Sequence, residues 1–165
     1  MIKVKMKSYY NIKKLTGKKT FYFDKFEISA DFTDQFLCLD DFLNMVNVIK
    51  ETLHTANYNY YTQISLSIVS ESQIRELNRD FRGIDSVTDV LSFPLDFEEG
   101  ILGDVVLCKK RCLKQSKTFG NSFNREMVYL TCHSILHLLG YDHMNKRDKK
   151  IMRSLEKEVM KKVYL

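Results

Sequence analysis

The stretch "HSILHLLGYDH", residues 133–143, holds a helix end and three of the chain's four histidines. His133 and His137 are four residues apart, so both side chains project from one face of a helix. Gly140 follows, where a helix can end with a positive φ at little steric cost. The chain can then turn back and bring His143 to the same point. The opposite side of the helix carries an apolar stripe for packing: Val128, Cys132, Ile135 and Leu139.

Three converging imidazoles with an open fourth position are typical of a catalytic zinc site. Such an ion acts as a Lewis acid and lowers the pKa of a bound water toward about 7. If only two histidines stood at this spacing, their placement would be explained best by chance. The third histidine, which follows a glycine, makes a metal site the better explanation. We therefore predict that His133, His137 and His143 bind one Zn²⁺ ion, although three imidazoles also accept nickel, copper or iron.

Ser134, the residue after the first histidine, distinguishes this chain from a metzincin protease. The histidine spacing equals the H-E-x-x-H-x-x-G-x-x-H frame of metzincin proteases, in which the glutamate activates water. This chain has Ser134 at that position, and a serine cannot serve as that base. Peptide hydrolysis is therefore disfavoured, and a zinc hydrolase of peptides or small molecules remains an alternative that rests on the spacing alone.

The rest of the pattern predicts one α+β domain over residues 1–165, with a small, about four-stranded mixed sheet and several helices. Apolar residues recur at spacings of three and four from residue 36 to 54, which predicts a helix. Residues 1–30 alternate weakly and predict one or two strands with a turn near Gly17. Strands are also expected at 62–69, 87–94 and 101–108, and helices at 71–81, 109–117, 122–139 and 146–163.

Composition sets broad limits on the kind of protein. The chain has 165 residues, of which 44% are hydrophobic, enough for a single packed domain. It has no apolar run of about 18 residues for a membrane span and no apolar segment typical of a secretion signal, so we expect a cytoplasmic protein without a membrane partner. Four cysteines without a CxxC pair predict reduced, mostly buried thiols: Cys38, Cys108, Cys112 and Cys132.

The charges are segregated along the chain. Residues 31–100 carry 4 Lys and Arg against 13 Asp and Glu, although the whole chain has a net charge of +5. Residues 109–125 contain six basic residues and no acidic one. Such segregation suits a surface that meets a polyanion, but solvated lysine in a lysine-rich chain explains it about as well. The candidate residues of this run for binding a polyanion, such as a nucleic acid, are Lys109, Lys110, Arg111 and Lys114.

At this point the chain resembles the YbeY family of endoribonucleases. That family's signature H-G-x-L-H-L-x-G-Y-D-H matches residues 133–143 everywhere except at Ser134, which replaces a glycine. Three more stretches resemble family blocks in the same order: "LNRDFRGIDSVTDVLSFP" (77–94), "LGDVVLC" (102–108) and "MRSLEKEV" (152–159). The resemblance covers about residues 37–163, and residues 1–35 match no family motif.

The resemblance implies a zinc-dependent endoribonuclease that cleaves single-stranded RNA. It implies maturation of the 3′ end of the small-subunit (16S) ribosomal RNA and ribosome quality control, with the small ribosomal subunit and its proteins as partners. By position, the three histidines become zinc ligands, and Arg82 falls on an arginine implicated in activity. A dication and a guanidinium together stabilise the charge that develops on a phosphoryl group.

Several alternatives stay open from the sequence. Asp142 could hydrogen-bond a ligand imidazole, or it could stabilise the turn after Gly140. The nucleophile could be an activated water or the 2′-hydroxyl of the RNA. A different class of function is a ribosome-assembly factor whose metal is mainly structural.

Overall fold

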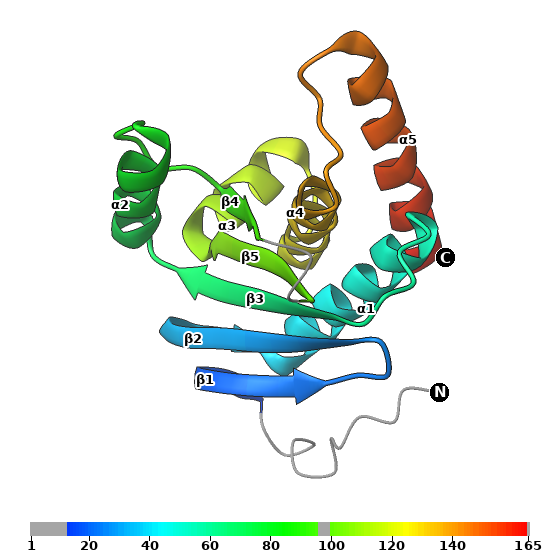
Figure 1. The fold of residues 1–165 in the computed structure, drawn as a ribbon. Coiled ribbons are helices and arrows are strands. Elements are labelled where there is room, and N and C mark those ends of the chain that lie inside the picture. Colours follow the sequence, from blue (N-terminus) through cyan, green and yellow to red (C-terminus); the bar gives the residue numbers. More distant parts are fainter. Residues whose placement is uncertain (1–12, 96–99, 165) are drawn as a thin grey trace.

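A five-stranded mixed sheet forms the centre of the molecule, in the order β1-β2-β3-β5-β4 (Figure 1). This computed structural model describes residues 13–95 and 100–164. The outer pairs β1/β2 and β4/β5 are antiparallel, whereas β2/β3 and β3/β5 are parallel. The strands are β1 (Lys14–Tyr22), β2 (Phe26–Cys38), β3 (Thr62–Val69), β4 (Val90–Pro94) and β5 (Ile101–Cys108).

The sheet has one strand more than the about four expected, because residues 14–38 form a long hairpin. Its turn lies between Tyr22 and Phe26, so the expected turn near Gly17 is wrong. Gly17 instead lies within β1, at φ 68°, where the pairing register with β2 shifts. Such a shift is a β-bulge, which glycine fits because it tolerates positive φ. The part of this expectation that concerns residues 1–12 lies outside the described residues.

In the described part of the chain five helices surround the sheet, and each lies where the sequence predicts a helix (Figure 1). The first begins at Leu39 and not at residue 36, because Leu37 still pairs with Leu15 across the hairpin. The strand expected at 87–94 likewise begins three residues later, at Val90. The helices are α1 (Leu39–Thr55), α2 (Glu71–Arg82), α3 (Lys109–Phe119), α4 (Phe123–Leu138) and α5 (Lys146–Val163).

Successive side chains of β5 point to opposite faces of the sheet and belong to two different apolar clusters. Val105 and Leu107 belong to the main core, which α1 and α4 complete. Val106 and Cys108 belong to a smaller cluster with Ile74 of α2. This division follows from the alternation of side chains along a strand. A third cluster packs α5 against α1 and α4 and contains Val48, Val128, Cys132, Leu136, Met152 and Val159.

The C-terminal end of α4 has the predicted turn. Gly140 adopts φ 87°, its N–H donates to the His137 carbonyl at 3.0 Å, and the N–H of Tyr141 donates to the Leu136 carbonyl at 3.0 Å. This pair of bonds is a Schellman motif, which satisfies carbonyls that the helix end leaves free. Asn145 then caps α5 by accepting from the Asp148 N–H at 2.9 Å. The chain therefore reverses within a few residues, and His143 lies in that reversal.

The packing side of α4 also agrees with the sequence, since Val128, Cys132 and Ile135 are fully buried. Leu139, the last of the predicted apolar stripe, is partly buried against the main core. Within residues 13–95 and 100–164, no helix is both long and apolar enough to cross a membrane.

Candidate metal centre

The three histidines of residues 133–143 come together as predicted. One ring nitrogen from each of His133, His137 and His143 lies within 4.8 Å of the other two. The Nε2 atoms of His133 and His137 are 3.1 Å apart, and the ring of His143 lies 5.1 Å from that of His137 between centroids. His133 and His137 are half-buried, whereas His143 is exposed. The cluster is therefore open to solvent on the side of His143.

The other ring nitrogens of the two helical histidines have fixed partners. The Nδ1 of His133 lies 2.6 Å from Oε1 of Glu156, and the Nδ1 of His137 lies 2.9 Å from the Tyr141 carbonyl oxygen. A carboxylate and a carbonyl can only accept, so each Nδ1 carries a proton and donates it. Each Nε2 then keeps a free lone pair that points into the cluster.

Electrostatics also favour the neutral form of His137. Burial lowers the pKa of His137, and the neighbouring His133 and His143 lower it further. Neutral imidazoles are the form that binds a metal. Three nitrogen donors, two of them on oriented rings, with an open side fit one metal ion, and this donor set does not by itself select among zinc, nickel, copper and iron.

Glu156 is the partner that sequence reasoning missed. It comes from α5 and is 7% exposed, and its Oε2 accepts a hydrogen bond from the Tyr129 hydroxyl at 3.4 Å. A signal was present in the sequence: Met152, Glu156 and Val159 share one helix face, so a carboxylate stands on the apolar side of α5. A buried carboxylate needs partners, and His133 and Tyr129 supply them.

Asp142 makes the contact expected of a turn residue. Its Oδ1 accepts a hydrogen bond from the Met144 N–H at 2.5 Å, two residues along the chain. The hydrogen bonds of His133 and His137 go to Glu156 and Tyr141 instead. Of the two roles considered for Asp142, the contacts favour the turn.

Ser134 has no access to the cluster's open side. The residue is fully buried, and among the described residues its hydroxyl has no hydrogen-bond partner. Leaving a hydroxyl unpaired in the interior costs about 1 to 3 kcal/mol. A buried serine cannot activate water, which agrees with the prediction that this chain lacks the protease base.

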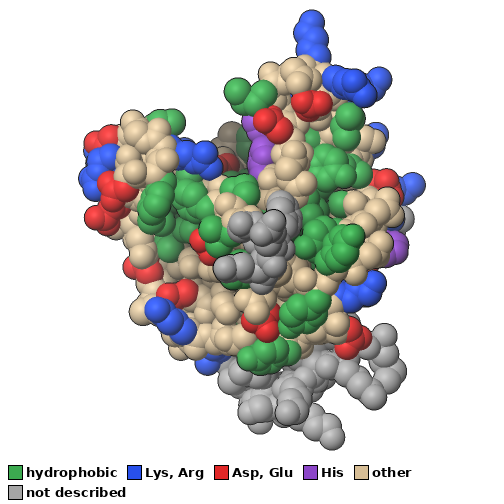
Figure 2. Space-filling model, in the orientation of Figure 1, with side chains coloured by type: hydrophobic (Ala, Val, Ile, Leu, Met, Phe, Trp, Pro, Cys, Tyr) green, Lys and Arg blue, Asp and Glu red, His purple; other side chains and the backbone are tan. Residues whose placement is uncertain are grey.

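Arg82 ends α2 and lies over the edge strand β4. Its guanidinium donates to the Ser92 carbonyl at 2.9 Å and lies 5.6 Å from the centre of the Phe93 ring. The carbonyl of Phe93 approaches Gly103 of β5, as does the side chain of Leu138, which follows His137 in α4. Figure 2 shows histidine side chains at the back of a hollow, with Lys or Arg side chains on its α2 side. Arg82 is therefore tied to the part of the sheet that contacts the histidine end of α4.

The basic run at the start of α3 is largely occupied by protein contacts. Lys109 donates to the Phe36 carbonyl at 2.7 Å and lies over the Phe36 ring. Lys110 forms an ion pair with Glu71 at 2.6 Å. Arg111 is half-buried and Lys114 is exposed. The partners of this run lie at the ends of β2 and α2 and not among the three histidines.

Comparison with known proteins identifies the family. The family model for endoribonuclease YbeY matches residues 31–164. A curated relative from Finegoldia magna, endoribonuclease YbeY, is 50% identical over 117 residues, which cover 68% of this chain and 74% of that one. The one from Clostridioides difficile is 40% identical over 148 residues and covers 85% of this chain and 91% of its own.

A solved structure is similar as well. The solution structure of TM1509 from Thermotoga maritima matches with a TM-score of 0.55 and 31% identity, covering 74% of this chain and 82% of that chain. Fold, histidine cluster and sequence relatives all agree: this chain belongs to the YbeY endoribonuclease family.

Proposed function

We propose that this protein is a zinc-dependent endoribonuclease that cleaves single-stranded RNA, and that its substrate is the 3′ end of the small-subunit (16S) ribosomal RNA. The observation that carries the proposal is the histidine cluster, in which two Nε2 lone pairs are oriented by fixed Nδ1 partners. We place the activity in the cytoplasm, in ribosome maturation and quality control, with the small ribosomal subunit and its proteins as partners.

Some residues of the chain would hold the metal ion, and others would stabilise charge on the phosphoryl group. When bound, a zinc ion supplies Lewis acidity that stabilises negative charge on a phosphoryl group. Glu156 and the Tyr141 carbonyl hold the two helical rings, and the exposed His143 completes the donor set from the following turn. Because Ser134 is buried and Glu156 is occupied by His133, neither side chain is placed to remove a proton from water at the open side.

Arg82 is the second source of positive charge. Its hydrogen bond to the Ser92 carbonyl uses one of the five donors of the guanidinium and fixes its position on β4. Among the described residues the other donors have no hydrogen-bond partner, so they can bind a phosphate through two parallel hydrogen bonds. Arg82 would then stabilise the charge that develops on the phosphoryl oxygens during cleavage.

The test uses purified, untagged protein with an unstructured RNA that contains the 16S 3′ end, and a scrambled RNA as control. We expect cleavage that stops with a chelator, returns when zinc is added, and is absent in His137→Ala. Full activity of the metal-free protein would contradict the proposal. Equal cleavage of the two RNAs would leave the nuclease standing and remove the 16S assignment.

Arg82→Ala separates the enzyme from an assembly factor with a structural metal. If the variant binds zinc and unfolds at the wild-type temperature but cleaves RNA at least about 100-fold more slowly, Arg82 acts in the reaction. If RNA processing in cells survives Arg82→Ala while His137→Ala unfolds the domain, the assembly factor is the better description. Casein cleavage by the wild type and not by His133→Ala would instead support a peptide hydrolase.

A further inference from the structure

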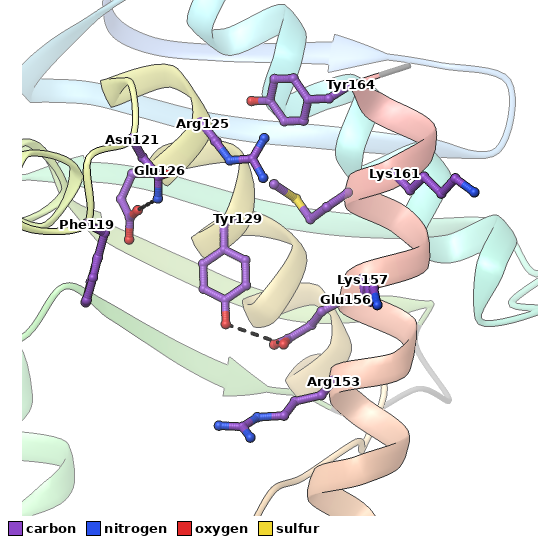
Figure 3. Close-up of a pocket in the computed structure, with 11 residues that line it drawn as sticks. Phe119, Asn121, Arg125, Glu126, Tyr129, Arg153, Glu156, Lys157, Lys161 and Tyr164 are labelled. Atoms are coloured by element: carbon purple, nitrogen blue, oxygen red, sulfur yellow. Dashed lines mark hydrogen bonds between the residues drawn. The ribbon is translucent and has the colours of Figure 1, made fainter.

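A groove beside the metal centre has no role in the chemistry described so far. It lies between α4 and α5 and has a volume of about 590 Å³ (Figure 3). Arg153 lines one end, and Tyr129 and Glu156, which both contact the ring of His133, lie between it and the other end. Tyr164, the last described residue, lines the far end. The groove therefore runs along α5 past the two residues that contact His133.

Four exposed basic side chains line this groove: Arg125, Arg153, Lys157 and Lys161. Within residues 13–95 and 100–164, none of the four forms an ion pair with a carboxylate, although Lys162 of the same helix pairs with Glu158 at 2.8 Å. The two acidic residues of the groove are buried and hydrogen-bonded. Glu126 accepts from Asn121 at 3.3 Å, and Glu156 is held by His133. The groove therefore carries four exposed basic side chains against two buried carboxylates, so positive charge predominates at its surface.

The spacing of these cations suits an extended anion. Arg153, Lys157 and Lys161 follow one another at intervals of four residues, so they form a row along one face of α5. At 1.5 Å per residue the row is about 12 Å long. Across the groove, Arg125 is held with its guanidinium 5.1 Å from the centre of the Tyr164 ring. A chain of phosphates fits this arrangement better than a single phosphate does.

Aromatic surface accompanies the charges. Phe119, at the end of α3, is 66% exposed, and Tyr129 and Tyr164 are 36% and 42% exposed. All three line the groove. Cationic tracks with exposed aromatic rings are how proteins bind single-stranded nucleic acid, because every unpaired base has a face that can stack. A duplex keeps its base faces covered and would use only the charges.

We propose that the α4–α5 groove binds single-stranded RNA on one side of the phosphate that is cut, with the α5 cations on the phosphates and Phe119 stacking on a base. The inference rests on the proposed nuclease function and adds a binding track to it. The track lies on α5 and the end of α3, away from the Lys109–Lys114 run that the charge pattern of the sequence suggested.

The charge part is tested with the double variant Lys157→Gln/Lys161→Gln. The control is Lys149→Gln/Lys150→Gln, which removes the same charge from exposed positions of the same helix outside the groove. A labelled single-stranded DNA oligonucleotide serves as the uncleavable probe. Each lost phosphate contact lowers the slope of log K against log salt by about 0.7. We expect the groove variant to bind about tenfold more weakly with a slope lower by about 1.4, and the control to match the wild type.

The stacking part is tested with Phe119→Leu and Phe119→Tyr. We expect the leucine variant to lose about fivefold or more in affinity for the oligonucleotide with an unchanged salt slope, and the tyrosine variant to retain affinity. Binding of heparin, which has no bases, should respond to the lysine variants and not to Phe119→Leu. If heparin and oligonucleotide respond alike to every variant, the groove is a general anion site and the RNA assignment is overturned.

Cleavage assays on the same variants separate this inference from the proposed function. We expect the groove variant to raise KM for a long RNA at wild-type zinc content, while the control variant cleaves like the wild type. Equal binding and equal KM in the groove and control variants would overturn the groove and leave the nuclease standing. A wild type that binds RNA through the groove and never cleaves it would overturn the nuclease alone.

Discussion

Glu156 orients the ring of His133. It lies on α5, which follows all three histidines in the sequence. It combines a 2.6 Å contact to Nδ1 of His133 with 7% exposure, so the carboxylate acts in a site of low polarity. There it keeps the Nδ1 proton in place and makes Nε2 a better donor. The orientation of His133 therefore depends on a residue outside the histidine cluster.

The variant Glu156→Gln tests that dependence. Glutamine can still accept a hydrogen bond, but it lacks the charge that raises the basicity of His133. We expect metal affinity to fall about 10- to 100-fold, measured by competition with a chromogenic chelator. Glu158→Gln, an exposed position on the same helix, is the control and should bind metal like the wild type. Unchanged affinity in folded Glu156→Gln would show that its contact with His133 is incidental.

The cysteines give a second prediction at this scale. Burial raises the pKa of the Cys132 thiol to about 12 and also raises the pKa values of Cys108 and Cys112, whereas Cys38 is exposed. Only thiolates react quickly with disulfide reagents. At about pH 8 we expect one fast thiol in the folded protein and four after denaturation, counted by absorbance. The fast thiol should disappear in Cys38→Ser, and persistence there would contradict the assignment.

Among single residues, the three candidate metal ligands could be predicted from the sequence, but the residues that hold them in place could not. His133, His137 and His143 lie within eleven residues, so helix geometry and one glycine suffice to bring them together. Glu156 reaches His133 across 23 residues of chain, through the packing of α5 on α4. Arg82 could be assigned only through the family resemblance, because its contact with Ser92 depends on where α2 lies over β4.

Among the elements, β5 occupies the most constrained position. It pairs with β3 on one side and β4 on the other, while α4 packs across it. Gly103 is where these neighbours meet: it has φ 145°, and a Cβ there would clash with the Phe93 carbonyl and with the Leu138 side chain. The glycine permits the close approach of the strand to the histidine end of α4.

Gly103→Ala should therefore destabilise the protein strongly. The substitution adds a steric clash to the strain of a positive φ, and we expect a loss of about 2 to 4 kcal/mol in the free energy of unfolding, measured with urea. Gly120→Ala is the matched control, because Gly120 has φ 67° and open space around its Cβ position. It should cost only about 1 kcal/mol. Equal losses of unfolding free energy in the two variants would show that the steric clash at Gly103 has no effect and that only the strain of the positive φ matters.

The elements themselves were largely predictable, and their ends less so. β3 and β5 match the expected 62–69 and 101–108 because their apolar residues are bounded by polar or turn residues. The hairpin of β1 and β2 was less clear, because its register includes a bulge at Gly17 that alternation cannot show. Residues 36–38 carry helical spacing and yet stay in β2, since pairing with β1 outweighs local preference.

For the whole molecule, the histidine cluster lies at the C-terminal end of α4 and in the turn that follows, at half-buried and exposed positions. The main apolar core joins the sheet to α1 and α4 through residues such as Phe32, Phe42 and Leu66. The sheet therefore has its own source of stability. A metal ion held by the three histidines would connect α4 to the 139–145 turn, and through the contact of His133 with Glu156 it would reach α5.

Removal of the metal should consequently loosen one side of the protein and leave the other folded. A ligand at 1,000 times its Kd stabilises the folded state by about 4 kcal/mol, so we expect the unfolding temperature to fall with a chelator and to return with zinc. Hydrogen exchange should become faster in residues 139–145 and the first turns of α5, and should stay unchanged in β2 and β3. His143→Ala should reproduce the chelated pattern without chelator. Uniform loss of protection throughout the sheet would mean that the metal holds the whole domain together, which is the behaviour of a structural site.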